Sequence, residues 1–320
     1  MRLRLRPFAI AVVMASALAP AARLAAQSAL IRACPAPPTA NAYDSCLVLA
    51  QAAMIAQPRL ALAAAGGAPL LGSSSTLGMR VGSRPRVAVQ LRGSGARMTM
   101  PAAGPGTGHS SMAWSFDADG AVALYQGLSP APTVGGVAAL DLLGSVGVVS
   151  GGSGFSGTPA TFGVGARLGI LRESFTAPGI SVSAMIHRTG ALLFTAPLDG
   201  ATARFSHIAD VAVRATVGKR FLGLGTLVGA GLDRTSGDVS ILPPPCMEIC
   251  LFPTPTVAPL TQTRASAFAD LTWTSLVLNA VAEVGWQRGG SPAASSFPTG
   301  YEDLVRRGGL FASLGLRLTI

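Results

Sequence analysis

Segments of about ten residues with alternating apolar and polar side chains recur along this chain, and no other feature restricts its possible folds as strongly. In TFGVGARLGILR (161–172), nearly every second residue is apolar, and most residues between them are glycine or arginine. The stretches 209–218, 264–273 and 276–286 repeat this pattern. Because successive side chains of a strand point to opposite faces, each segment predicts a strand with one apolar and one polar face.

The composition indicates that the apolar faces meet lipid. The chain of 320 residues is 49% hydrophobic and only 12% charged, whereas soluble domains have about 25% charged residues. No stretch after residue 30 has roughly 18 unbroken apolar residues, so the sequence predicts no transmembrane helix in the mature chain. A closed β-barrel is then the remaining membrane fold, because only helices and closed barrels satisfy their backbone groups in lipid.

The connections between the expected strands alternate in length. Counted from the C-terminus, the expected strands are 308–320, 275–288, 262–274, 221–234, 203–218, 178–188, 161–172, 136–149, 118–128 and 85–100. Short turns, such as 219–220 and 274–275, alternate with long connections, such as 235–261. Outer-membrane barrels show this alternation, with long loops outside and short turns in the periplasm. The pattern therefore predicts a periplasmic C-terminus.

Two further segments raise the expected number of strands. The alternating pattern predicts ten strands, and residues 59–66 and 76–82 could add a hairpin around GAPLLGSSS. We therefore expect about twelve strands, with ten as the next alternative. The predicted fold is all-β, a single transmembrane antiparallel up-and-down β-barrel over residues 59–320.

Residues 1–27 have the features of a secretory signal peptide. A basic head with Arg2, Arg4 and Arg6 precedes the short apolar stretch AIAVVMASALA and a zone of small residues. This order is typical of an export signal. The alternative is a buried N-terminal helix.

Residues 28–58 differ from the barrel segments. CPAPPTANAYDSC is a Pro-rich loop between Cys34 and Cys46, and helix-forming residues follow as far as Pro58, where we expect the helix to end. The sequence thus predicts a short helix that a Cys34–Cys46 disulfide tethers beneath the barrel or inside it.

The four cysteines form two local pairs, with Cys246 and Cys250 as the second. After a secretion signal, an even number of cysteines predicts disulfides in an oxidising compartment. A zinc site is the alternative, but no histidine lies near either pair.

The last strand carries a resemblance to a known class of proteins. GGLFASLGLRLTI (308–320) ends in mid-strand with apolar residues at alternate positions. Together with the export signal, the alternating spans and the loop asymmetry, it resembles a bacterial outer-membrane β-barrel protein of no specific functional family. The resemblance implies an outer-membrane location, contact with its lipid and recognition by the barrel-assembly machinery. The residues that would form the assembly signal are Leu314, Leu316, Leu318 and Ile320. The chain ends in isoleucine, where such barrels usually end in an aromatic residue.

Charged residues within the expected strands fall mostly on one face. Arginine on the lipid face at mid-membrane would cost roughly 2–4 kcal/mol, so this face is predicted to line the lumen. The candidates are Arg86, Arg92, Asp141, Arg167, Arg204, Asp210, Arg214, Arg264, Asp270, Glu283 and Arg317. Arginine outnumbers the acids in this set, which would favour anionic solutes in an open pore. The alternative is an arginine–carboxylate network that braces a closed interior.

Enzymatic chemistry has little support in the sequence. Ser206 and His207 are the only adjacent Ser/His pair, but neighbours on a strand point to opposite faces and cannot share a site. His187 is expected in the lumen and His109 in a loop. We expect no catalytic residues, metal or cofactor, and no nucleic-acid binding, since arginine is spread among apolar spans.

The segment 241–260 is apolar for a loop and rich in proline. Exposed apolar patches often mark contact sites, although this loop could also pack on its own rim. The leading hypothesis is a passive pore or structural membrane protein. The alternatives are a closed barrel that acts in surface interaction or adhesion through its loops and, more remotely, a lipid-modifying enzyme.

Overall fold

A computed structural model describes most of the chain. The described residues are 30–31, 40–78, 84–101, 108–130, 135–195, 201–242, 256–290 and 302–320. For residues 40–45 and 256 the structure describes only the backbone. The predicted signal peptide lies outside these residues.

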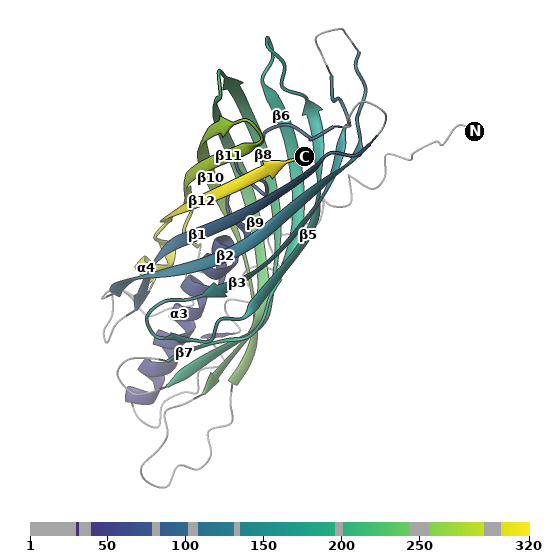
Figure 1. Ribbon diagram of the computed structural model, residues 1–320. Coiled ribbons are helices and arrows are strands. Elements are labelled where there is room, and N and C mark those ends of the chain that lie inside the picture. The colour runs from purple at the N-terminus through teal and green to yellow at the C-terminus, as the bar shows by residue number, and fades with distance from the viewer. Residues whose placement is uncertain are drawn as a thin grey trace, which may run out of the picture.

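Ten long antiparallel strands close into a barrel (Figure 1). They are β1 (Val87–Pro101), β2 (Gly108–Tyr125), β3 (Leu140–Ser150), β5 (Ala160–Leu171), β6 (Gly179–Thr189), β8 (Thr202–Phe221), β9 (Leu224–Leu242), β10 (Thr256–Ser275), β11 (Leu278–Gln287) and β12 (Gly309–Thr319). The sheet closes because β1 pairs with both β2 and β12, and β8 with both β6 and β9. The predicted closed antiparallel barrel is confirmed.

Two short strands lie outside this ring. β4 (Phe155–Ser156) pairs with β7 (Leu192–Thr195). β7 in turn pairs with residues 202–205 of β8, and β6 pairs with the same edge of β8 from residue 208 to residue 218. The two ends of the barrel differ. At the short-turn end, β8–β9 and β10–β11 are joined by the two-residue turns 222–223 and 276–277. At the opposite, long-loop end, β9 and β10 are joined across 243–255. Which end faces the periplasm remains a prediction.

The expected twelve barrel strands are wrong, because residues 59–65 form helix. They belong to α3 (Ala40–Ala65), which continues through Pro58 instead of ending there. Residues 76–78 are not in a strand, and 79–83 lie outside the described residues. The sequence RLALAAA alternates in bulk, but leucine and alanine are strong helix formers and here their helix propensity prevails.

The helix α3 lies within the barrel, towards the long-loop end, near β7 and the short helix α4 (Glu302–Arg306) (Figure 1). Its segment Cys46–Ala65 is long and apolar enough to cross a membrane, yet 94% of it is buried inside the protein. The sequence predicted no such helix, because its apolar run is interrupted by Gln51, Gln57 and Arg59.

Of the four cysteines, only Cys46 lies in the described part of the chain, where it is disulfide-bonded. Cys34, Cys246 and Cys250 lie outside it. The pairings Cys34–Cys46 and Cys246–Cys250 therefore remain predictions.

Side-chain polarity divides the barrel wall into two levels, as β9 shows. From Leu224 to Leu232 its outward residues are mainly apolar and exposed, and its inward Asp233 and Thr235 are buried. Beyond Leu232 the outward residues from Arg234 to Ser240 are polar, and beyond Thr235 the inward side chains Val239 and Ile241 are apolar. We call the first level the spanning region. Its nine residues on β9 match the ~9–11 residues of a tilted transmembrane strand.

The second level, here called the extension, consists of residues 202–208 of β8, 235–242 of β9 and 256–262 of β10. Its inner face joins the N-terminal half of α3 in one hydrophobic core that includes Phe205, Ile241 and Leu260. Its outer face is polar along β8 and most of β9, whereas β10 exposes Val257 and Pro259 there. The extension therefore has the polarity of a water-soluble sheet.

Candidate functional site: the plugged lumen

The lumen contains the chain's own N-terminal segment. We call residues 46–78 the plug: the buried part of α3 and the segment Gly66–Gly78 that follows it. Side chains of eight strands form hydrogen bonds with the plug: β1, β2, β3, β5, β8, β10, β11 and β12. The plug thus runs from the long-loop end towards the short-turn end, where β1 begins.

The wall compensates for a defect within α3. Pro58 has no N–H, so the carbonyl of Met54 four residues earlier loses its helical donor. Nε2 of Gln262 donates to this oxygen at 3.0 Å, and Nη2 of Arg264 donates to it at 2.7 Å. The helix therefore continues through the proline because β10 supplies the missing hydrogen bonds.

The C-terminus of α3 is capped inside the lumen. The last four carbonyls of a helix have no helical partner. Here the carbonyl of Leu62 accepts from Gly66 N at 2.7 Å, and Gly66 has the positive φ of 67° that suits a glycine cap. Oγ of Ser115 lies 2.7 Å from the Ala63 carbonyl.

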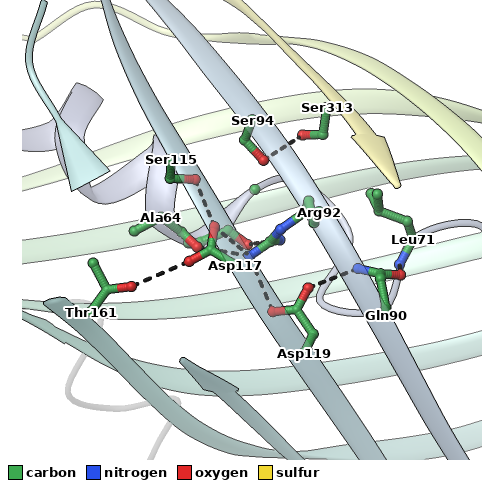
Figure 2. Close-up of polar contacts among 12 residues, drawn as sticks. Ala64, Leu71, Gln90, Arg92, Ser94, Ser115, Asp117, Asp119, Thr161 and Ser313 are labelled. Atoms are coloured by element: carbon green, nitrogen blue, oxygen red, sulfur yellow. Dashed lines mark hydrogen bonds and ion pairs between the residues drawn. The ribbon is translucent and has the colours of Figure 1, made fainter. Parts of the chain in front are cut away.

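Arg92 of β1 completes this cap (Figure 2). Its Nη2 and Nη1 donate to the carbonyls of Ala64 and Ala65, each at 2.8 Å. The guanidinium also faces the carboxylates of Asp119 at 3.3 Å and Asp117 at 3.6 Å. A cation at the negative end of a helix dipole is stabilising, so Arg92 both balances these acids and holds the helix end.

Arg214 of β8 binds the next two carbonyls. Its Nε donates to Gly67 O at 2.9 Å and its Nη2 to Gly66 O at 3.2 Å. The same Nη2 lies 2.5 Å from Oδ1 of Asp233 on β9. The helix end is therefore held from both sides of the lumen.

Wall carboxylates accept the backbone N–H groups that follow. Glu283 accepts from Gly67 N at 3.0 Å and from Ala68 N at 2.6 Å. Asp270 accepts from Gly72 N at 2.7 Å. The backbone of this non-helical segment is thus satisfied by side chains of β10 and β11.

Near the short-turn end the wall binds both backbone groups of Leu71. Arg317 donates to its carbonyl, and its N–H donates to Oε1 of Gln90 at 2.9 Å. Further along, Asp141 accepts from Leu77 N at 3.0 Å and is itself paired with Arg167 at 2.7 Å. The plug is therefore anchored along its non-helical part, mainly through its backbone.

Nine of the eleven residues predicted for the lumen face are buried in the interior: Arg92, Asp141, Arg167, Asp210, Arg214, Arg264, Asp270, Glu283 and Arg317. Arg86 and Arg204 are exposed instead. Arg86 precedes β1, and Arg204 faces outward from the extension, so neither lies within the polar interior.

Three buried acids were missed by sequence reasoning: Asp117, Asp119 and Asp233. Asp117 lies in a segment predicted as a loop before a strand at 118, whereas β2 begins at Gly108. Asp119 lies within that predicted strand but was not assigned to the lumen face. Asp233 shares parity with the inward glycines of its own strand, and this signal could have revealed it.

Two histidines lie on opposite faces of the barrel wall. His187 is buried on the inner face of β6, whereas the side chain of His207 is 85% exposed and lies 3.2 Å from Asp238. Within the described parts of the chain, no cluster of His, Cys, Asp or Glu could hold a metal ion.

Comparisons with known proteins found similar chains among solved structures alone. No protein-family model and no curated protein matches the sequence. Among solved structures, the chain is similar to the translocator domain of the autotransporter NalP from Neisseria meningitidis, at 9% identity and a TM-score of 0.37, covering 73% of this chain and 88% of that one.

Two further solved structures are similar to the chain. An outer membrane channel from Pseudomonas putida F1 has 9% identity and a TM-score of 0.32, with 78% of this chain and 98% of that one covered. The copper transporter OprC has 12% identity and a TM-score of 0.29, with 76% of this chain covered; the match spans only 44% of OprC. These scores are too low to transfer a function.

The chain is an outer-membrane β-barrel protein. This conclusion rests on the closed antiparallel ring, its apolar outer band and its polar interior, since a sheet that spans lipid must close on itself to satisfy its backbone groups, and outer-membrane barrels have this distribution of polarity.

Proposed function

We propose that this protein is a channel-type outer-membrane barrel that its own N-terminal segment keeps closed at rest. The observation that carries the proposal is the match between wall and plug. Side chains of eight strands bind the main chain of residues 54–77. A passive, permanently open pore would have no use for such a set of anchors.

The burial of α3 supports a resting state that is almost entirely closed. Leu47, Leu49, Met54, Leu60 and Leu62 are fully or almost fully buried. Exposing them would cost roughly 1.5–3 kcal/mol each. The total exceeds the ~5.5 kcal/mol that shifts a two-state equilibrium from one extreme to the other. Opening therefore requires a partner or force that withdraws the plug.

The charges of the wall set the solute preference that we propose for the open state. The described strands bury five arginines and seven carboxylates on the inner face. Asp117, Asp119 and Asp233 offset the arginine surplus expected from the sequence. We therefore propose a lumen that weakly favours cations over anions once the plug is withdrawn.

Conductance in planar bilayers tests the proposal. The intact protein should show no open steps. Replacing Ala53 and Ala56, both fully buried in α3, by aspartate should expel the helix and produce conductance steps. The matched control, Ser236→Asp with Ser240→Asp, adds two charges to the outer face of the extension and should stay closed.

Two results would count against this function. Open steps from the intact protein would contradict the closed resting state. A plug variant that remains folded and still does not conduct would leave a closed barrel without transport. Folding is checked in each case by the gel-mobility shift between boiled and unboiled samples.

We further propose a non-catalytic role, a C-terminus on the periplasmic side and recognition of the last strand by the barrel-assembly machinery. The outward residues Leu314, Leu316 and Ile320 are exposed in the band that would face lipid. Their side chains are thus accessible to the barrel-assembly machinery during insertion.

A second candidate function is surface interaction through the extension. β8, β9 and β10 are 19 or 20 residues long, about twice the length that a tilted membrane span needs. Their additional length forms the extension, which lies beyond the lipid. Cells that display the protein should lose attachment to their target surface when Arg204 and His207, on the outer face of the extension, are changed to alanine.

A further inference from the structure

Besides Arg204 of the extension, four arginines point outward from the barrel wall. Arg97 lies on β1, Arg188 on β6 and Arg234 on β9, and Arg288 directly follows β11; all four are exposed. They come from separate parts of the sequence. The barrel distributes them around its circumference.

These arginines lie where the apolar outer band ends. Each is two residues beyond a member of the band on the same face: Gly95, Ile186, Leu232 and Trp286 respectively. The last three are exposed and apolar. The four arginines, here called the outer arginine ring, therefore follow the long-loop border of the spanning region.

The strand register supports a common level for the ring. Arg234 pairs with Val211 and Arg188 with Ala209, and these partners are neighbours on one face of β8. On the other side of the barrel, Arg97 pairs with Met112 of the outer band. The ring is thus a border around the barrel and not a patch on one strand.

The surroundings of three ring members leave room for an anion. Among the described residues, no carboxylate lies within ion-pair distance of Arg97, Arg188 or Arg288. Small or short side chains occupy neighbouring strands at this level, including Ser110, Ala209 and Thr263.

We propose that the outer arginine ring binds the phosphate groups of lipid headgroups in the leaflet at the long-loop end. The guanidinium presents donors in a planar fork that matches phosphate oxygens. The ring is continuous with the apolar band, so a lipid whose chains pack on that band brings its phosphate to this level. The contact fixes the depth of the barrel in the membrane. It is independent of whether the lumen ever opens.

Lipid selectivity in vesicles tests this inference. The protein is reconstituted in mixed phosphatidylcholine and phosphatidylglycerol, and spin-labelled forms of each lipid report how strongly the barrel surface retains them. The intact protein should retain phosphatidylglycerol at least about twofold more strongly, since each basic group near the surface attracts anionic lipid. The triple variant Arg97→Gln, Arg188→Gln, Arg288→Gln should reduce the ratio towards one.

A matched triple variant at the other end provides the control. Arg84, Arg86 and Arg220 are exposed near the short-turn end, and their replacement by glutamine removes the same charge. This control should keep most of the selectivity. Equal loss in both triple variants would overturn the ring as a site and indicate a general charge effect. Unchanged selectivity in the ring variant would also overturn it. Both variants must show the heat-dependent gel shift of a folded barrel.

Discussion

The spanning region and the extension share the same three strands but reverse their polarity. Along β9, outward Val228 is apolar and inward Asp233 is charged, whereas further on outward Ser240 is polar and inward Ile241 is apolar. The backbone is the same continuous strand in both. The difference must therefore come from what each face contacts.

In the spanning region, the outer face meets lipid and the inner face meets plug backbone, whose N–H and C=O groups need partners. In the extension, the outer face of β8 and β9 is mainly polar, and the inner face packs on the apolar side of α3. The polarity of a barrel wall thus follows its contents as well as its solvent. Four substitutions can break or sharpen this contrast.

The largest effect is expected from Arg92→Leu on the inner face of the spanning region. It leaves Asp117 and Asp119 buried without their cation and removes two donors from the end of α3. Breaking such a buried pair costs about 3–5 kcal/mol. Urea unfolding in lipid vesicles, followed by tryptophan fluorescence, measures this loss. Arg86→Leu, exposed just before the same strand, should change stability by less than about 0.5 kcal/mol.

In the extension, Phe205→Ala should cost about 3–4 kcal/mol, because this side chain is fully buried beside Phe155 and α3. The same unfolding measurement applies. A polar inner face at this level would instead tolerate the change. A loss below about 1 kcal/mol would contradict a packed core in the extension.

The outer faces can be compared with one residue type at two positions of β9. Val228→Arg places a charge in the apolar band and should cost about 2–4 kcal/mol. Ser240→Arg, on the same face of the extension, should be nearly neutral. Equal losses at both positions would show that lipid also covers the extension.

The smallest effect is expected from Ser115→Ala. This hydroxyl lies 2.7 Å from the Ala63 carbonyl and 2.6 Å from Oδ2 of Asp117. Its loss should cost about 1 kcal/mol. Ser111→Ala on the same strand loses only a 3.4 Å contact to Gly151 O and should cost less. The reverse order would argue against the serine as part of the helix cap.

Much of the barrel was predictable, because alternation is a local property of each strand. The inward Arg167 and outward Val164 of β5 could be assigned by parity alone. The plug could not. Its bonds join residues that are far apart in the sequence, such as Arg214 and Gly67, which are 147 positions apart, and no local pattern encodes them.

The errors have physical causes. Pro58 normally ends a helix, but Gln262 and Arg264 replace the bond that it removes. The run RLALAAA mimics strand alternation, although its alanines favour helix. Both errors arose because the environment inside the barrel was unknown when the segment was read alone.

Hydrogen exchange at the amides of the non-helical plug tests the central claim most directly. The N–H groups of Gly67, Ala68, Leu71 and Gly72 belong to no regular element, so only wall side chains can protect them. In vesicles, these amides should exchange as slowly as those of the barrel strands. Exchange at the rate of an unstructured peptide would show that the plug is not held in the lumen.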